Sequence, residues 1–165
     1  MSASYEPKLY RFDRNAVVVA SAGTGKTHAL VGVILHALLG ATNLVGRGKA
    51  VDPRRLIATT FSRKAGAEIR VRLVQELEKI AAGAPTAYDT TLRENHPHPD
   101  KIAKEARRAL EQIGRSQIGT LHAFATSIVK AHALELGLPL GLEFEREEDR
   151  KQRMIDAVVF ATEEL

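Results

Sequence analysis

The chain alternates short apolar runs with longer stretches in which apolar residues recur every three or four positions. The run at Ala16–Ala20 is continuous and apolar, as in a buried strand of a parallel sheet, and Leu56–Thr60 and Ser116–Thr120 predict two further strands. A helical pattern follows each run; the three patterns cover residues 27–39, 62–82 and 121–136. This alternation predicts an α/β fold whose parallel sheet is covered by helices on both faces.

The segments between these elements are less regular. Residues 1–15 show no clear periodicity, and residues 41–53 predict a polar loop. Residues 83–100 carry three prolines and few apolar side chains, so we expect them to be the least structured stretch. Two further helices are expected, one capped by Asp100 and one after an acidic run; their apolar positions are Ile102, Ala106, Leu110 and Ile113, and Met154, Ile155, Val158, Val159 and Thr162.

Composition limits the class of protein. The chain has 165 residues and is 44% hydrophobic, which suits one ordinary domain with a core and excludes a disordered chain. No apolar run approaches the ~20 residues of a membrane span, so no membrane partner is expected. There is no cysteine, which excludes disulfides, a thiolate nucleophile and a cysteine zinc site. With no apolar signal stretch at the N-terminus, we expect a cytoplasmic protein.

Charge is distributed unevenly. The formal net charge is +4, yet residues 44–75 hold eight lysines and arginines against only Asp52 and Glu68. Such a basic block suits a polyanionic partner, and a merely solvated basic face would have the same composition. Charge alone leaves both interpretations open.

The segment with the clearest chemistry is 16–27, Ala-Val-Val-Val-Ala-Ser-Ala-Gly-Thr-Gly-Lys-Thr. A strand, a glycine-rich turn and a helix opened by Lys-Thr form the order that a phosphate-binding loop needs, although Ala20 replaces the usual first glycine. Lys26 would reach the β- and γ-phosphates, and the Thr27 hydroxyl would ligate Mg²⁺, which makes both catalytic candidates. The predicted nucleotide-binding residues are Ala20, Ser21, Ala22, Gly23, Thr24, Gly25, Lys26, Thr27 and His28. The alternative is a tight turn without ligand.

Three segments in order resemble a known family. These are residues 20–27, the stretch Ala-Thr-Thr-Phe-Ser-Arg-Lys-Ala-Gly-Ala-Glu-Ile-Arg-Val-Arg-Leu at 58–73, and Ile-Gly-Thr-Leu-His-Ala-Phe at 118–124. They resemble motif I, motif Ia and the Gly-Thr-Phe/Ile-His-Ser-Phe motif of superfamily-one DNA helicases of the UvrD/RecB/AddA type. The segment 142–158 is also similar to the start of that family's helical subdomain 1B.

The resemblance implies a three-layer P-loop NTPase fold of the RecA type with a parallel sheet, incomplete here. Residues 1–140 would form part of domain 1A, and residues 141–165 would begin subdomain 1B. The implied function is the N-terminal portion of an ATP-dependent 3′-to-5′ DNA helicase/exonuclease in DNA repair or recombination, with ATP, Mg²⁺ and single-stranded DNA as ligands. Any exonuclease activity would lie outside this chain. By the same resemblance the DNA contacts are Thr60, Phe61, Arg63, Lys64, Thr120 and His122, with Phe124 as a further candidate.

Each DNA candidate has a simpler alternative. Phe61 and Phe124 would also suit a core, and His122 would also bond a neighbouring backbone group. Arg70 and Arg72 are expected to be solvated helix charges.

Several family features are missing. No apolar strand leads into an Asp-Glu-x-x-Asp motif, and arginines from a second RecA-like domain are not present, so we expect little or no turnover by this chain alone. The missing C-terminal domains of the same chain, and other members of a helicase–nuclease complex, are the implied partners. The first glutamine is Gln75, so the family's adenine-reading glutamine is absent; Tyr10, Arg11 or Phe12 are candidates to stack on the base instead.

Three other interpretations remain open. A small P-loop kinase of a nucleoside or metabolite suits the length, but no arginine-rich lid is visible. A non-catalytic nucleic-acid-binding module with a vestigial loop is disfavoured by the intact Lys26 and Thr27. His96 and His98 with Asp100 form a weak candidate metal site.

Overall fold

The computed structural model describes residues 10–12, 15, 17–19, 23, 25–139, 149 and 151–156. Its α-helices are α1 (Lys26–Leu38), α2 (Arg63–Ala82), α3 (Asp89–Asn95), α4 (Ile102–Gln112) and α5 (Leu121–Ala131). Its strands are β1 (Ile57–Thr60) and β2 (Gln117–Thr120), and its short 3₁₀ turns are η2 (Pro53–Arg55), η3 (Pro99–Lys101) and η4 (Ile113–Arg115).

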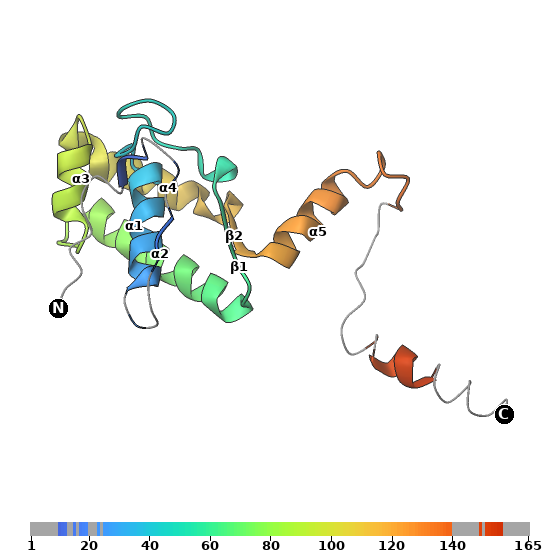
Figure 1. Cartoon of the computed structure of the whole chain (residues 1–165). Helices are drawn as coiled ribbons and strands as arrows, with labels where there is room; N and C mark the ends of the chain where they lie inside the picture. The colour runs from blue at the N-terminus through green and yellow to red at the C-terminus, as the bar shows by residue number, and fades with distance from the viewer. Residues whose placement is uncertain are drawn as a thin grey trace, which may run out of the picture. The chain divides into compact units, whose positions relative to one another are not determined.

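The core lies between α1, α2 and α4 (Figure 1). α2 presents a stripe of buried side chains at helical spacing, and it packs against both other helices and against the sheet. Leu73 and Leu77 of this stripe are fully buried, as are Leu35 of α1 and Ala106 of α4. The periodicities at 27–39, 62–82 and 102–113 therefore predicted these helices correctly, and the inward faces of α2 and α4 with them. The inward face expected for α1 was Leu30, Val33, Ile34, Ala37 and Leu38; of these Leu30 and Val33 are only partly buried, and Val31 and Leu35 are fully buried instead.

β1 and β2 form a parallel pair in which Ile57 faces Gln117 and Thr60 faces Thr120. α2 covers the sheet so closely that a Cβ on Gly66 would lie 3.1 Å from the Cα of Gly119. One turn later, Nη2 of Arg70 donates a 2.9 Å hydrogen bond to the carbonyl oxygen of Ile118. The expectation that Arg70 is a solvated charge is therefore wrong, because this partly buried side chain ties α2 to β2 across 48 residues of sequence.

The strand expected at Ala16–Ala20 is not observed at its described residues. Val17, Val18 and Val19 have no regular secondary structure, and Val17 and Val19 are 90% and 93% exposed. A strand persists only where a neighbour completes its backbone hydrogen bonds, and the described residues form a sheet of β1 and β2 alone. The β-branched composition of this segment was not sufficient without such a partner.

Residues 83–100 are more ordered than their prolines suggested, because they contain α3. Asp89 accepts hydrogen bonds from the backbone N–H and the hydroxyl of Thr86, each at 3.0 Å. These bonds join Asp89, the first residue of α3, to the segment before the helix, and Leu92 buries the apolar side of the short helix. The expected cap at Asp100 is also wrong, since Asp100 lies inside η3 and α4 begins at Ile102 without a side-chain cap.

Contacts divide the chain into two compact units, residues 1–124 and 125–165. In the second unit, described residues 151–156 are helical, in agreement with the pattern around Met154 and Ile155; Val158, Val159 and Thr162 lie outside the described residues. The predicted boundary between residues 140 and 141 also falls outside them and stays a prediction. In the part of the chain that the structure describes, no helix combines the length and apolar character needed to cross a membrane.

Replacing Arg70 with methionine should destabilise the first unit. Removing the guanidinium leaves the partly buried Ile118 carbonyl without its partner, which costs about 1–2 kcal/mol of unfolding free energy. The matched control is Arg72→Met, because Arg72 forms a 2.6 Å ion pair with Glu68 in which both side chains are about half exposed. That variant should change stability by less than about 0.5 kcal/mol in urea denaturation. Equal losses in the two variants would contradict the role assigned to Arg70.

Stability should fall as the pH drops below 6.5, because of His36. This side chain is buried in α1, its Nδ1–H donates a 2.7 Å bond to the carbonyl of Gly32, and burial lowers its pKa to about 4. A folded-state pKa below the unfolded value means that protons favour the unfolded chain, so the loss develops between pH 6.5 and 4 and totals about 3 kcal/mol.

The check is the unfolding free energy of the wild type and of His36→Gln measured from pH 8 to pH 4.5. The unfolding free energy of the wild type minus that of His36→Gln should decrease as the pH falls from 6.5 toward 4.5, because only the wild type carries the buried imidazole. A constant difference for His36→Gln would show that this histidine titrates alike in both states.

Candidate functional site

The glycine-rich turn is described at two of its positions. Gly23 and Gly25 both have positive φ angles, 77° and 86°, a conformation that glycine adopts without the steric cost of a side chain. Gly25 directly precedes α1 and lies in the left-handed region. Ala20, Ser21, Ala22 and Thr24 lie outside the described residues. The two described glycines have the conformational freedom that a loop curled around a ligand requires.

Lys26 and Thr27 are the first two residues of α1. Gly25 offers no side-chain cap, so the first N–H groups of the helix have no intrahelical carbonyl to bond. Such N–H groups, together with the positive end of the helix dipole, attract anionic oxygens. Lys26 is exposed and Thr27 is partly buried, so the start of α1 presents an ammonium and a hydroxyl beside these N–H groups.

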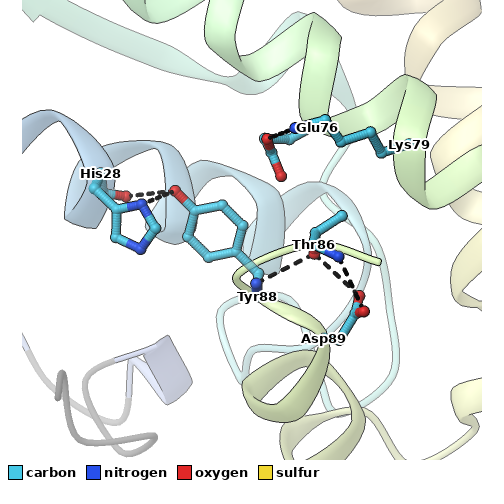
Figure 2. A network of polar contacts seen from close by, with 6 residues as sticks. All are labelled: His28, Glu76, Lys79, Thr86, Tyr88 and Asp89. Atoms are coloured by element: carbon cyan, nitrogen blue, oxygen red, sulfur yellow. Dashed lines mark hydrogen bonds and ion pairs between the residues drawn. The ribbon is translucent and has the colours of Figure 1, made fainter. Parts of the chain in front are cut away.

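His28 is held by a tyrosine that the sequence did not bring forward (Figure 2). Its ring stacks on Tyr88, with centroids 4.5 Å apart and planes 16° from parallel. The Tyr88 hydroxyl lies 2.9 Å from Nδ1 of His28 and 2.9 Å from the His28 carbonyl oxygen. Burial raises the pKa of Tyr88, so the phenol stays protonated at neutral pH. Tyr88 lies 60 residues from His28, and only the fold brings the two together.

An open cavity of about 130 Å³ adjoins this pair. It lies between α1, α2 and the segment before α3, and its lining residues are His28, Val31, Arg72, Gln75, Glu76, Ala87 and Tyr88. Glu76 forms a 2.6 Å ion pair with Lys79 through Oε1, while its Oε2 is buried without a hydrogen-bond partner among the described residues. The cavity wall is therefore polar on the α2 side, and on the opposite side it carries the rings of His28 from α1 and Tyr88 from the segment before α3.

Tyr10 is not available to stack on a nucleotide base. It is buried, and its ring stacks on His36 with centroids 4.2 Å apart. A Cβ on Gly32 would lie 2.8 Å from Cε1 of Tyr88 and 2.9 Å from the hydroxyl of Tyr10, so both tyrosines rest on α1 at this glycine. Arg11 is exposed, and its Nε donates to Oδ1 of Asn95 at 2.9 Å. The expectation for Tyr10 is therefore wrong.

The candidate DNA contacts lie at and beyond the carboxyl ends of the two strands. Thr60 and Thr120 end β1 and β2 and are direct partners in the register. Phe61 follows β1 with 97% of its surface exposed, so it takes no part in the core that the described residues form. Arg63 and Lys64 open α2 and are exposed, as is His122 in the first turn of α5. The structure thus gathers a hydroxyl pair beside an exposed ring and two cations that follow the same strand.

Two hydroxyl groups at this edge already accept hydrogen bonds from backbone N–H groups. Oγ1 of Thr120 accepts a 3.1 Å bond from the N–H of Ala123, and the Ser62 hydroxyl caps α2 by accepting from the N–H of Ala65 at 3.3 Å. These bonds fix the turns that follow the strands. They leave Phe61, Arg63 and Lys64 at the surface.

The histidines near Asp100 have a structural role. His96 is buried, and its Nδ1 accepts a 2.9 Å bond from the backbone N–H of His98. Among the described residues, no group of three or more His, Asp or Glu side chains is arranged to hold a metal ion.

Comparison with known proteins agrees with the motifs. The family described as UvrD/REP helicase N-terminal domain matches residues 3–165. The chain is 30% identical over 139 residues to a subunit of the ATP-dependent helicase/nuclease of Lysinibacillus sphaericus, which covers 84% of this chain and 10% of that protein. It is 33% identical over 130 residues to the protein of the same name from Streptococcus thermophilus, and 30% identical over 146 residues to that of Desulforamulus reducens.

These last two matches cover 79% and 88% of this chain, but only 9% and 10% of the two relatives. The chain therefore spans about a tenth of the length of the curated relatives that it matches. The family match extends over nearly every residue, including all three of the motifs. The chain belongs to the UvrD/REP helicase N-terminal domain family.

Proposed function

We propose that this chain is the ATP- and single-stranded-DNA-binding N-terminal portion of an ATP-dependent 3′-to-5′ DNA helicase. The observation that carries the proposal is the start of α1, where a left-handed glycine leads directly into Lys26 and Thr27 in a chain of this helicase family. The resemblance adds DNA repair or recombination as the setting, and the expectation from the N-terminal sequence adds the cytoplasm as the location.

ATP would bind at the start of α1. The N–H groups of the first turn, which have no intrahelical carbonyl to bond, and the Lys26 ammonium suit the phosphate oxygens, and the Thr27 hydroxyl suits Mg²⁺. When bound, Mg²⁺ neutralises charge that develops between the β- and γ-phosphates. The chain's own contribution is to orient the triphosphate at the start of α1 and to place the Lys26 ammonium beside the β- and γ-phosphates.

Single-stranded DNA would bind across the strand ends. Arg63 and Lys64 supply charge for two neighbouring phosphates, and the exposed ring of Phe61 offers a face for one base. Thr60, Thr120 and His122 supply hydrogen-bonding groups at the same edge. Because these cations are the first two residues of α2, movement of α2 would be transmitted to bound DNA.

Turnover would require parts outside this sequence. The chain spans about a tenth of its relatives and contains no Asp-Glu-x-x-Asp motif, so a second acidic site and catalytic arginines would come from elsewhere in the same protein. The relatives are named as subunits of a helicase/nuclease, which supports further members of a helicase–nuclease complex as partners.

The proposal is tested by binding of ATP and of a labelled oligothymidine to this chain. Lys26→Ala should lower ATP affinity at least tenfold and leave DNA affinity nearly unchanged, because the lysine is placed for phosphates of the nucleotide. The Arg63→Ala/Lys64→Ala double variant should weaken DNA binding and reduce its logarithmic salt slope by about 1.4, the value for two contacts to single-stranded DNA.

Lys101→Ala/Lys104→Ala is the matched control, because both lysines are exposed on the η3–α4 segment and stand outside the proposed sites. It should alter neither affinity. DNA binding without any nucleotide binding would favour a nucleic-acid-binding module with a vestigial loop. DNA-independent phosphate transfer to a small acceptor would favour a kinase; in either case the helicase proposal fails.

A further inference from the structure

Two of the short 3₁₀ turns lie side by side at the amino ends of the strands. η2 leads into β1, η4 leads into β2, and the two turns are in contact. The N–H of Gln117 donates a 3.0 Å bond to the carbonyl oxygen of Leu56, so the hydrogen bonding between the strands begins directly after the turns. This end of the sheet is opposite to the end at Thr60 and Thr120, where single-stranded DNA is proposed to bind.

Each of the two turns ends in an arginine at the same level of the sheet. Arg55 and Arg115 are the last residues of η2 and η4, and each precedes a strand residue by two positions. Those strand residues, Ile57 and Gln117, are direct partners in the register, which brings the two arginine positions close together. Both side chains are exposed, and neither forms an ion pair among the described residues.

Two further arginines extend this surface. Asp52 holds Arg54, because its carboxylate accepts a 3.1 Å bond from Nε and a 2.6 Å bond from Nη2. α4 is in contact with η2, and the pKa of the Asp52 carboxyl is lowered to about 2, mainly by the hydrogen bonds from Arg54 and also by the charge of Arg108. Nη1 of Arg108 lies 3.6 Å from Oε2 of Glu105, and most of the Arg108 side chain is exposed. The members of this arginine surface are Arg54, Arg55, Arg108 and Arg115, which outnumber the two acids.

The residue types of the arginine surface match the outside of double-stranded DNA. All of its cations are arginines, whose planar guanidinium can bond two oxygens of one phosphate. No aromatic residue occurs in η2, η4 or α4, so these elements offer no ring on which an unpaired base could stack. The opposite end of the sheet does offer one, the exposed ring of Phe61. A duplex stacks its bases inside and presents phosphates outside, so its backbone is bound by cations without a ring.

We propose that the arginine surface binds the phosphate backbone of double-stranded DNA, at the end of the sheet opposite to the single-stranded site. This inference goes beyond the proposed function and rests on it only for the position of the single strand. β1 and β2 are four residues long, so the two ends of the sheet lie about 10 Å apart. The chain would thus contact both parts of a junction, the unpaired strand at one end of the sheet and the duplex at the other.

The test measures the binding of a labelled blunt duplex and of labelled oligothymidine to this chain as a function of salt. The variant is Arg55→Gln/Arg115→Gln, in which two exposed side chains without ion pairs lose their charge, so the fold should be retained. Arg72→Gln/Arg93→Gln is the matched control, because it removes the same charge from exposed arginines of α2 and α3, outside both DNA surfaces. Circular dichroism verifies that each variant is folded.

Arg55→Gln/Arg115→Gln should weaken duplex binding about tenfold at low salt and reduce its logarithmic salt slope by about 1.8, the value for two contacts to B-form DNA. Its affinity for oligothymidine should stay nearly unchanged, and the control should alter neither affinity. The Arg63→Ala/Lys64→Ala variant should give the converse result, with weaker oligothymidine binding and nearly unchanged duplex binding.

The outcomes separate this inference from the proposed function. If duplex binding is unchanged in Arg55→Gln/Arg115→Gln while oligothymidine binding still depends on Arg63 and Lys64, the arginine surface is only solvated; the inference is overturned and the proposed function stands. If oligothymidine and ATP do not bind but the duplex binds through Arg55 and Arg115, the proposed function fails and this inference stands.

Two further results would overturn the assignment to duplex DNA. Equal weakening of both DNA probes in Arg55→Gln/Arg115→Gln would show that the arginine surface does not distinguish a duplex from a single strand. Poly-L-glutamate that binds more tightly than the duplex, with the same dependence on both arginines, would assign the surface to an acidic protein partner instead.

Discussion

The packing of α2 is the constraint on which the rest of the first unit depends. This single helix buries its apolar stripe against α1 and α4 and rests on the sheet at Gly66, where an added Cβ would lie 3.1 Å from the Cα of Gly119, closer than ordinary van der Waals contact. Its first residues carry Arg63 and Lys64, and Arg70 binds the backbone of β2 one turn beyond Gly66. The position of the exposed cations relative to the strand ends therefore follows from how closely the helix approaches the strands.

A row of two histidines and a glycine on one face of α1 packs against two tyrosines. His28, Gly32 and His36 recur every four residues and so lie on one face of the helix. Tyr88 stacks on the first, Tyr10 on the last, and both tyrosines contact the helix at the glycine between them. The row connects the start of α1, where the triphosphate is proposed to bind, to the N-terminal segment and to the segment before α3. The two histidines differ in environment, because His36 is fully enclosed while His28 is only partly buried.

The sequence predicted the helices whose apolar residues recur at regular spacing and the strand ends that helical patterns follow directly. α1, α2 and α4 were evident because their apolar residues recur at helical spacing, and the strand ends at Thr60 and Thr120 were evident because helical patterns begin directly after them. The segment 16–20 was misjudged for the opposite reason, since a strand needs a neighbour and composition cannot supply one. α3 was missed because three prolines obscured the Thr86–Asp89 pair, which joins the first residue of the helix to the segment before it.

The sequence by itself determined the chemistry that this protein carries: the glycine–lysine–threonine turn, the three motifs in order and the basic block that follows Leu44. These depend on residue types at short spacing, which the chain displays directly. Only the tertiary structure decided that Arg70 holds the sheet, that Tyr10 is buried against His36, and that Tyr88 bonds to His28. Each of these contacts joins residues that are far apart in sequence, where no local pattern records which side chains will meet.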